Sequence, residues 1–282
     1  MGYSQGGKYM SVFEAKKQIV EMGRRMYAKG FVAANDGNIS CRTGVNEVVC
    51  TPTGVSKGFL TPNMLVTVDM NGKVLSGNMS PSSEIKMHLR VYKEKSDITA
   101  VTHAHPMAAT SFAIAGIPLD KAVLPEQVVL LGSVPIAKYA LTGTHEVPDS
   151  IAPYLQEYNA VLLANHGALT WGRSIEEAFF RLEEVEYFAQ ITLNVYTLLG
   201  RANELSCEQV DQLLEVRKKF GINTGGLPLC GGEATNMKDV VSSTDTSSPI
   251  VKLIDDGEDN TSAQTSELVK EITALVLKQL KG

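Results

Sequence analysis

Along residues 1–230 the apolar positions alternate between a helical period and a strand period. Spacings of three and four predict helices over residues 11–30, 80–95, 106–116, 146–158 and 174–200. Short β-branched or apolar runs bounded by Gly, Pro or Asn predict strands within residues 37–54, 64–77, 97–105, 127–140 and 159–172. Because the strands occur both in hairpins and between helices, we expect a mixed α/β domain and no regular βαβ repeat.

The ends of several predicted elements carry specific signals. The Asn71-Gly72 pair predicts the turn of a hairpin. Either Ser80 or Ser82 could be the N-cap of the helix over residues 80–95. Pro106 and Gly116 bound the next helix, and the helix over 174–200 opens with Ser174 and Glu177, a possible capping box. These signals predict where the helices next to the polar loops begin.

The composition changes near residue 231. Residues 231–264 are rich in Ser, Thr, Asp and Gly, and bury too little apolar surface to offset the entropy of ordering, so we interpret them as a flexible linker. Residues 265–282 have apolar side chains at spacings of three and four, which predicts a short amphipathic helix. The expected organisation is a domain over residues 1–230, a linker and a terminal helix.

Composition and charge exclude several classes of protein. The net charge of −5 argues against a nucleic-acid surface, which needs a basic stripe. We expect no signal peptide and no membrane span, because no apolar segment has the required length. The four cysteines form no C-x-x-C pair, which favours buried thiols in a reducing cytosol. These are Cys41, Cys50, Cys207 and Cys230.

Two histidines close the predicted strand over residues 97–105. On a strand, residues i and i+2 point to the same face, so His103 and His105 project together and could hold one ion. A lone histidine there would more often be a packed core residue, but the pair favours a metal site. His166, at the end of another predicted strand, supplies the third ligand that a catalytic zinc site with an open position needs. A cupin-like site is disfavoured, since no glutamate follows the pair.

The remaining two histidines have other expected places. His145 lies in a predicted loop, and His88 follows Glu84 by four residues on a predicted helix, where it would orient a neighbour. Three loops, "NDGNIS", "TPTGVSKG" and "SPSSE", are small, polar and mostly glycine-bearing. Each alone is an ordinary turn or N-cap, but together with three histidines they suggest a phosphate-binding cradle. Lys57 could add charge beside it, although we expect a solvated loop lysine.

The order and spacing of "GNIS", "TPTG", "PSSE", "HAHP" and "LLANHGALTWG" resemble the class II aldolase/adducin family, most of all its fuculose-phosphate aldolase branch. The resemblance covers about residues 11–220, and the combination of motifs is more specific than any one of them. It implies a single α/β/α domain around a mixed, largely antiparallel sheet, and a homotetramer with sites between subunits. It also implies a cytoplasmic metal-dependent lyase.

Residue by residue, the resemblance implies one Zn²⁺ per subunit and a sugar-phosphate substrate. Glu84 would be the acid/base, and would also touch the metal when substrate is absent. The zinc ligands would be His103, His105 and His166, and the phosphate would bind at Gly37, Asn38, Thr53, Gly54, Ser82 and Ser83. The implied reaction cleaves a deoxyketose 1-phosphate to dihydroxyacetone phosphate and L-lactaldehyde through a metal-stabilised enediolate.

The sequence departs from the family at the second proton donor. The fuculose enzymes use a tyrosine that reaches in from a neighbouring subunit, whereas the matching segment "LDKAVLPEQVVLLG" has none. Glu126 and Gln127 lie nearest, and Glu126 is the candidate replacement. The same metal site also fits a sugar-phosphate epimerase or dehydratase. A third alternative is a non-enzymatic assembly protein of the adducin type, which the intact set of histidines disfavours.

The amphipathic helix predicted at residues 265–282 resembles the encapsulation peptides of enzymes packed in bacterial microcompartments. Docking onto its own domain is the plain alternative, but the long linker makes it less natural. A short tethered helix gains stability by placing its apolar face in a partner groove, here of a shell or core protein. Binding to a membrane surface is disfavoured because the lysines are few and the linker is acidic.

Overall fold

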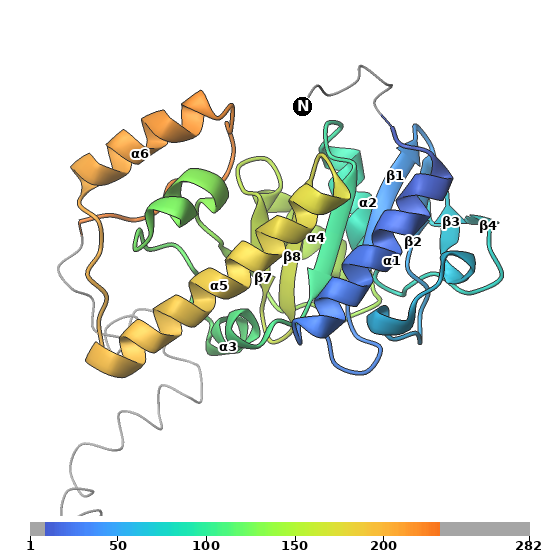
Figure 1. Ribbon diagram of the computed structural model, residues 1–282, viewed down its shortest axis with the longest axis horizontal. Coiled ribbons are helices and arrows are strands. Elements are labelled where there is room, and N and C mark those ends of the chain that lie inside the picture. Colours follow the sequence, from blue (N-terminus) through green and yellow to red (C-terminus); the bar gives the residue numbers. More distant parts are fainter. Residues whose placement is uncertain (1–8, 232–282) are drawn as a thin grey trace, which may run out of the picture. The chain divides into compact units, whose positions relative to one another are not determined.

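The computed structural model describes residues 9–231, and the predicted terminal helix and almost all of the predicted linker lie outside the described residues. The described chain folds around one eight-stranded sheet of order β4-β3-β2-β1-β5-β8-β7-β6 (Figure 1). All neighbouring strands are antiparallel except β6 and β7. The strands are β1 Asn38–Gly44, β2 Glu47–Cys50, β3 Val66–Val68, β4 Val74–Ser76, β5 Ala100–Ala104, β6 Ile136–Ala137, β7 Ala160–Leu163 and β8 Gly167–Gly172.

Helices cover both faces of this sheet. One layer holds α1, α3 and α5, in which α5 contacts both other helices and the three together contact strands β1, β5 and β8, while α2 and α4 pack together on the other face. This arrangement confirms the predicted α/β/α domain. The helices are α1 Val12–Ala28, α2 Ile85–Glu94, α3 Met107–Ala115, α4 Glu146–Ile151, α5 Ile175–Leu199 and α6 Cys207–Lys219. Shorter helical turns are η1 Lys57–Phe59, η2 Pro62–Met64, η3 Gln127–Leu131 and η4 Ala152–Tyr154.

The core lies between the sheet and its two helical layers. On the side of α2 and α4, β-branched strand residues pack against the apolar faces of these helices around the fully buried Trp171. The two free cysteines, Cys41 and Cys50, are buried as predicted, and burial raises the pKa of each thiol to about 12. The centre of the sheet is therefore a rigid platform for side chains at its strand ends.

The helix starts follow the predicted signals only in part. Ser174 accepts a hydrogen bond from the Glu177 backbone N–H, but the Glu177 carboxylate takes the N–H of Arg173 instead of completing a capping box. The N-cap prediction for α2 is wrong. Glu84 occupies that position, and the Ser82 hydroxyl accepts from the Glu84 N–H one step earlier. The Ser82 hydroxyl therefore closes a tight turn before α2, and this turn places Glu84 at the start of the helix.

The strand predicted over residues 127–140 is also wrong in its first half. The run "QVVLL" forms the π-helical turn η3, and only Ile136–Ala137 is a strand. A short continuous apolar run does not distinguish a strand from a buried helical turn. The turn is closed by the Gln127 side chain, which donates to the Gly132 carbonyl at 2.7 Å, and by Gly132 at φ 86°.

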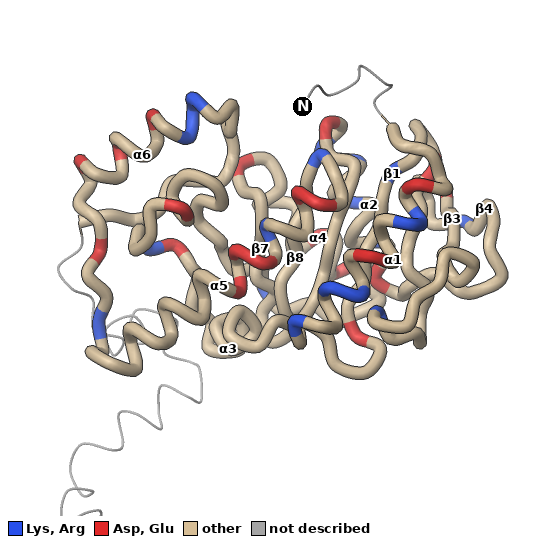
Figure 2. The backbone as a smooth tube through the Cα atoms, in the orientation of Figure 1, with Lys and Arg blue, Asp and Glu red and all other residues tan. Residues whose placement is uncertain are grey.

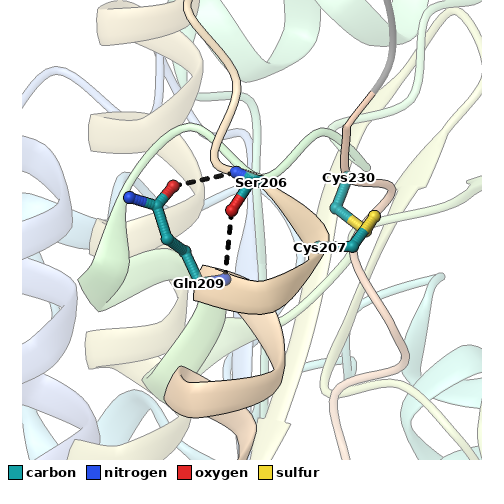
Figure 3. The surroundings of a disulfide bond; sticks show 4 residues. All are labelled: Ser206, Cys207, Gln209 and Cys230. Atoms are coloured by element: carbon teal, nitrogen blue, oxygen red, sulfur yellow. Dashed lines mark hydrogen bonds between the residues drawn. A yellow bond between two sulfur atoms is a disulfide. The ribbon is translucent and has the colours of Figure 1, made fainter.

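The last described segment, residues 200–231, holds a helix that the sequence pattern did not predict. Helix α6 begins at a capping box formed by Ser206 and Gln209 (Figure 3). Beside it, Cys207 and Cys230 form a disulfide, which corrects the expectation of four free thiols. Main-chain hydrogen bonds from Leu229 to Asp120 and from Gly231 to Leu205 bring the two cysteines together although 23 residues separate them.

Figure 2 shows both signs of charge spread over the described elements, with α5 mostly acidic. One of the acidic residues of α5, Glu186, is buried, and its two carboxylate oxygens accept the N–H groups of Ala108 and Ala109 at 3.1 and 2.8 Å. Glu186 therefore caps α3, whose own N-cap residue, Pro106, supplies no side-chain acceptor. Among the described residues, no helix is long and apolar enough to cross a membrane.

Candidate active site

The three predicted ligand histidines meet at one end of the sheet centre. His103 lies in β5, paired with Asn38 of β1 and Leu169 of β8, and His105 directly follows the strand. His166 lies in the turn between β7 and β8. The ring centroids are 4.6 to 4.9 Å apart, and one ligand atom from each ring lies within 4.8 Å of the others. Sheet register thus brings His166 beside a pair that lies about 60 residues earlier in the chain.

The turn that carries His166 depends on its neighbours in sequence. Asn165 adopts a left-handed conformation with φ 57°, a conformation that asparagine tolerates better than most residues. Gly167 leaves room for the histidine pair, because a Cβ there would lie 2.5 Å from the Ala104 carbonyl oxygen and 2.7 Å from Cδ2 of His105. The motif "NHG" is therefore needed to place two of the three imidazoles.

Hydrogen bonds orient the imidazoles toward a common point. Nδ1 of His103 donates to the Ala168 carbonyl at 2.9 Å, which leaves its Nε2 as an unprotonated ligand atom. That Nε2 lies 3.1 Å from Nε2 of His105. Complete burial lowers the pKa of His103 to about 3, and burial also lowers the pKa of His166. Both rings are neutral at pH 7, the state in which imidazole binds a metal.

Glu84 faces the same point from the start of α2. Its carboxylate oxygens lie 3.4 Å from Nε2 of His103 and 3.3 Å from Nε2 of His166. Asn38 donates to Oε2 at 2.8 Å and holds the carboxylate in place. Burial raises the pKa of Glu84, but the two facing imidazoles and the Asn38 amide lower it by more, so the group is ionised at neutral pH.

The donor set fits a divalent metal ion. Three imidazoles converge with one carboxylate, whose Oε1 is buried and has no hydrogen-bond partner among the described residues. Three nitrogen ligands with a nearby carboxylate and an open side are typical of catalytic zinc sites, although other first-row metals accept the same ligands. His103, His105 and His166 could thus hold a metal, with Glu84 beside it.

A cavity of about 220 Å³ opens in front of the histidines. All six residues predicted to bind phosphate line it, together with Glu84, His105 and His166. They come from three separate loops, and the six are Gly37, Asn38, Thr53, Gly54, Ser82 and Ser83. Their placement in one cavity is what a shared site requires, while a phosphate-binding role stays a prediction.

The cavity also contains residues that sequence reasoning missed. Asp36 lies 3.5 Å from Nδ1 of His105, so it faces that ring opposite its metal-binding side. The sequence signal that could have identified Asp36 is its position directly before Gly37 in "NDGNIS". The expectation of a solvated Lys57 is wrong, since its side chain is only 1% exposed. Thr142 also lines the cavity, and it lies in a loop that contains none of the motifs found in the sequence.

The structure places Glu126 and His88 outside the histidine cluster, so neither has a direct role in it within one chain. Glu126, the candidate proton donor, lines a separate cavity of about 260 Å³ with Glu184 and Tyr187, away from the histidines. His88 is buried in the core, where its Nδ1 and the Tyr92 hydroxyl both lie 2.7 Å from the Ser40 hydroxyl. His88 therefore belongs to a hydrogen-bonded network under the site.

Comparison with known proteins places these features in context. Residues 17–193 match the class II aldolase and adducin N-terminal domain. A Methanococcus maripaludis protein named L-fuculose phosphate aldolase is 34% identical over 174 residues, which is 62% of this chain and 93% of the relative. A protein of the same name from Escherichia coli K12 is 31% identical over 210 residues, 73% of this chain and 95% of the relative.

Two solved structures resemble the described fold. One is of an L-fuculose 1-phosphate aldolase, with a TM-score of 0.69 and 32% identity, covering 76% of this chain and all of the other. The second is of YgbL from Klebsiella pneumoniae, described as a putative aldolase, epimerase or decarboxylase, with a TM-score of 0.66 and 28% identity. It covers 72% of this chain and 99% of the other.

Proposed function

The chain belongs to the class II aldolase and adducin family and is an aldolase-type lyase, and on that premise we propose its particular reaction. We propose a zinc-dependent cleavage of a deoxyketose 1-phosphate of the L-fuculose type to dihydroxyacetone phosphate and L-lactaldehyde. The observation that carries this proposal is the approach of Glu84 to the histidine cluster inside a cavity lined by three small polar loops. Relatives named L-fuculose phosphate aldolase support the same substrate class.

The metal in this proposal is held by His103, His105 and His166. When bound, zinc supplies Lewis-acid polarisation of the substrate's carbonyl and hydroxyl oxygens. The protein contributes an orienting hydrogen bond to Nδ1 of His103 and a carboxylate, Asp36, near Nδ1 of His105. These contacts fix which nitrogen of the His103 and His105 rings would face the ion.

Glu84 is the group that moves the proton at carbon 3 of dihydroxyacetone phosphate. Its lowered pKa keeps it as a carboxylate able to accept a proton, and the reverse transfer delivers the proton when the sugar is cleaved. Asn38 limits the carboxylate to one orientation, so that the transferring oxygen stays on the cavity side. Asn38 therefore has a second duty beside the predicted contact with phosphate.

The phosphate end of the substrate fits the three small loops. Gly37 and Gly54 have φ 74°, which turns the loop backbone in a way that L side chains rarely adopt. Hydroxyls at Thr53 and Ser83 lie along the same cavity, and hydroxyl and backbone N–H donors suit a phosphate group. These loops orient the sugar phosphate so that its carbonyl faces the histidines.

The second proton donor and the assembly are linked in this proposal. Within one chain Glu126 lies in another cavity, so it would act on the aldehyde oxygen of a neighbouring subunit in a homotetramer. Glu126 is exposed at the start of η3, which allows it to reach across such an interface. A Glu126→Gln variant would then keep metal and phosphate binding while losing turnover.

The terminal helix at residues 265–282 lies outside the described residues. Its amphipathic pattern supports a packaging role, in which the helix attaches the cytoplasmic enzyme to a microcompartment shell or core protein. Deletion of residues 261–282 should leave the aldolase activity unchanged and abolish association with shells in a co-purification assay. Loss of activity on deletion would contradict a separable tag.

The direct test is a product-identified assay of the zinc-loaded protein on L-fuculose and L-rhamnulose 1-phosphates. Release of dihydroxyacetone phosphate from one of them, measured by a coupled dehydrogenase, is the expected result. Isomerised or dehydrated sugar phosphate without cleavage would instead support an epimerase or dehydratase. Absence of both products from a protein that also binds no divalent ion would favour an adducin-like assembly role.

A further inference from the structure

Lys57 is a fully buried lysine at the edge of the proposed phosphate site. It begins the helical turn η1, and its side chain is 1% exposed. Its ammonium donates to the carbonyl of Asn35 at 2.6 Å and to the carbonyl of Val55 at 2.7 Å. These two carbonyls belong to the loops that contain Gly37 and Gly54, so one ammonium joins two walls of the cavity.

The packing around Lys57 keeps it in this position. Helix α1 has a glycine at position 23 where η1 crosses it, and a Cβ there would lie 2.7 Å from the Lys57 carbonyl oxygen. Gly58 packs against the ring of Tyr27 in the same way, since a Cβ would approach its Cγ to 2.5 Å. The turn can therefore lie directly on α1, and the lysine stem is held between α1 and the cavity.

The charge of Lys57 is unusual in its surroundings. No other lysine or arginine lines the cavity among the described residues, whereas Asp36 and Glu84 both do. Burial lowers the pKa of Lys57 to about 8, and the two carboxylates act against that shift, so the group is mostly charged at pH 7. A phosphate entering without this ammonium would meet two carboxylates and no lysine or arginine among the described residues that line the cavity.

An ammonium has three N–H donors, and backbone carbonyls take only two of them here. Two carbonyls alone compensate poorly for the cost of burying a charge, because the ammonium loses its hydration when it is buried. A substrate anion at the cavity would offset that cost. We propose that Lys57 is a phosphate-recognition residue, whose ammonium both ties the two loops together and supplies the cavity's positive charge to the sugar phosphate. The proposal rests on the proposed function.

The two duties of Lys57 can be separated by substitution. Lys57→Gln removes the charge but keeps N–H donors for the loop carbonyls, although its side chain is shorter. Lys57→Met removes both. Lys17→Met, on the exposed face of α1, is the matched control for loss of one positive charge. Each full-length, zinc-loaded variant is titrated with inorganic phosphate by calorimetry, and its zinc content and melting temperature are measured.

The charge role predicts that Lys57→Gln weakens phosphate binding about tenfold, with zinc content and melting temperature close to those of the wild type. The KM for the sugar phosphate should rise by a similar factor with kcat changed less than about twofold, and Lys17→Met should match the wild type. Lys57→Met should weaken phosphate binding at least as much and also lower the melting temperature.

Two results would overturn the proposal. Phosphate affinity equal in Lys57→Gln and the wild type would show that the charge does not recognise phosphate. A Lys57→Gln variant that loses zinc and melts as early as Lys57→Met would show that the lysine is a structural tie only. Failure of the proposed function is a different outcome, because the wild type itself would then release no dihydroxyacetone phosphate.

Discussion

The two sides of the cavity are built by different means. The histidine side, meaning His103, His105 and His166, lies at the ends of central strands, where main-chain pairing across β1, β5 and β8 fixes each position. The loop side, meaning residues 35–37, 52–57 and 82–83, lies outside the named strands. Main-chain hydrogen bonds from Thr53 to Ser80 and from Ser82 to Thr51 join two of its loops, and the Lys57 ammonium joins the third through the Asn35 carbonyl. Sheet register positions the metal ligands, whereas hydrogen bonds between loops position the proposed anion site.

Removing the metal should have the largest effect, because it abolishes the function of the histidine side outright. Incubation with a chelator, or the His105→Ala substitution, should reduce zinc from about one ion per chain to a trace and lower activity below detection. Elemental analysis and the cleavage assay measure both. His145→Ala, outside the cavity, is the control, and full activity in chelated protein would show that no metal is used.

The Glu84→Gln substitution tests the proposed proton transfer by Glu84, which lies between the histidines and Asn38. Glutamine still accepts the Asn38 hydrogen bond but cannot take up a proton, so kcat should fall by roughly 10²- to 10⁴-fold while the fold is kept. Steady-state kinetics and exchange of the substrate proton with deuterated water measure the loss. Exposed Glu21→Gln on α1 should behave as the wild type. Unchanged proton exchange in Glu84→Gln would assign the base elsewhere.

A smaller effect concerns the buried network beneath the histidine side. Burial lowers the pKa of His88 to about 4, so between about pH 4 and 6.5 the unfolded chain binds a proton that the folded chain does not. Stability contributed by this group is therefore present above pH 6.5 and lost as the pH falls toward 4, by about 3 kcal/mol at most.

Urea unfolding at a series of pH values measures this slope. The His88→Gln variant, which keeps a polar side chain near Ser40, should show a shallower loss of stability with acid than the wild type. Metal-free protein is used for both, so that release of zinc does not enter the comparison. Parallel slopes would mean that His88 is not the group that takes up the proton.

The smallest expected effect is the loss of one hydroxyl on the loop side. Ser83 is exposed in the cavity and makes no hydrogen bond that holds the fold among the described contacts, so Ser83→Ala should raise KM about fivefold and leave kcat and stability unchanged. Ser111→Ala on α3, which loses a bond to the Met107 carbonyl, is the matched control. A fall in kcat alone would place Ser83 nearer to the reacting carbons than to phosphate.

The difference between the two sides also explains what the sequence could predict. His103 and His105 were predictable because a strand has a fixed period and its end is marked by Pro106. The mixed α/β class followed from the alternation of helical and strand periods in the same way, because local periodicity determines it without knowledge of distant contacts. The α/β/α layers were expected only from the resemblance to the family.

Features that depend on distant contacts were not predictable. The burial of Lys57 requires Gly23 of α1 to let the turn approach, which no local pattern around residue 57 reveals. The turn η3 is anchored from α6, where Arg217 donates to the Val128 carbonyl, and α6 itself went unpredicted. The pairing of Cys207 with Cys230 likewise follows from main-chain bonds to residues 120 and 205.

That pairing has a mechanical consequence. Leu229 is attached to the domain edge by two main-chain hydrogen bonds, which tension along the chain could break one at a time. Cys230 is bonded covalently to the first residue of α6, so a pull on the chain beyond Gly231 acts on Cys207 as well as on Leu229. For as long as the disulfide is oxidised, a force on residues 232–282 is therefore shared between two attachment points of the domain, and the hydrogen bonds of Leu229 do not carry it alone.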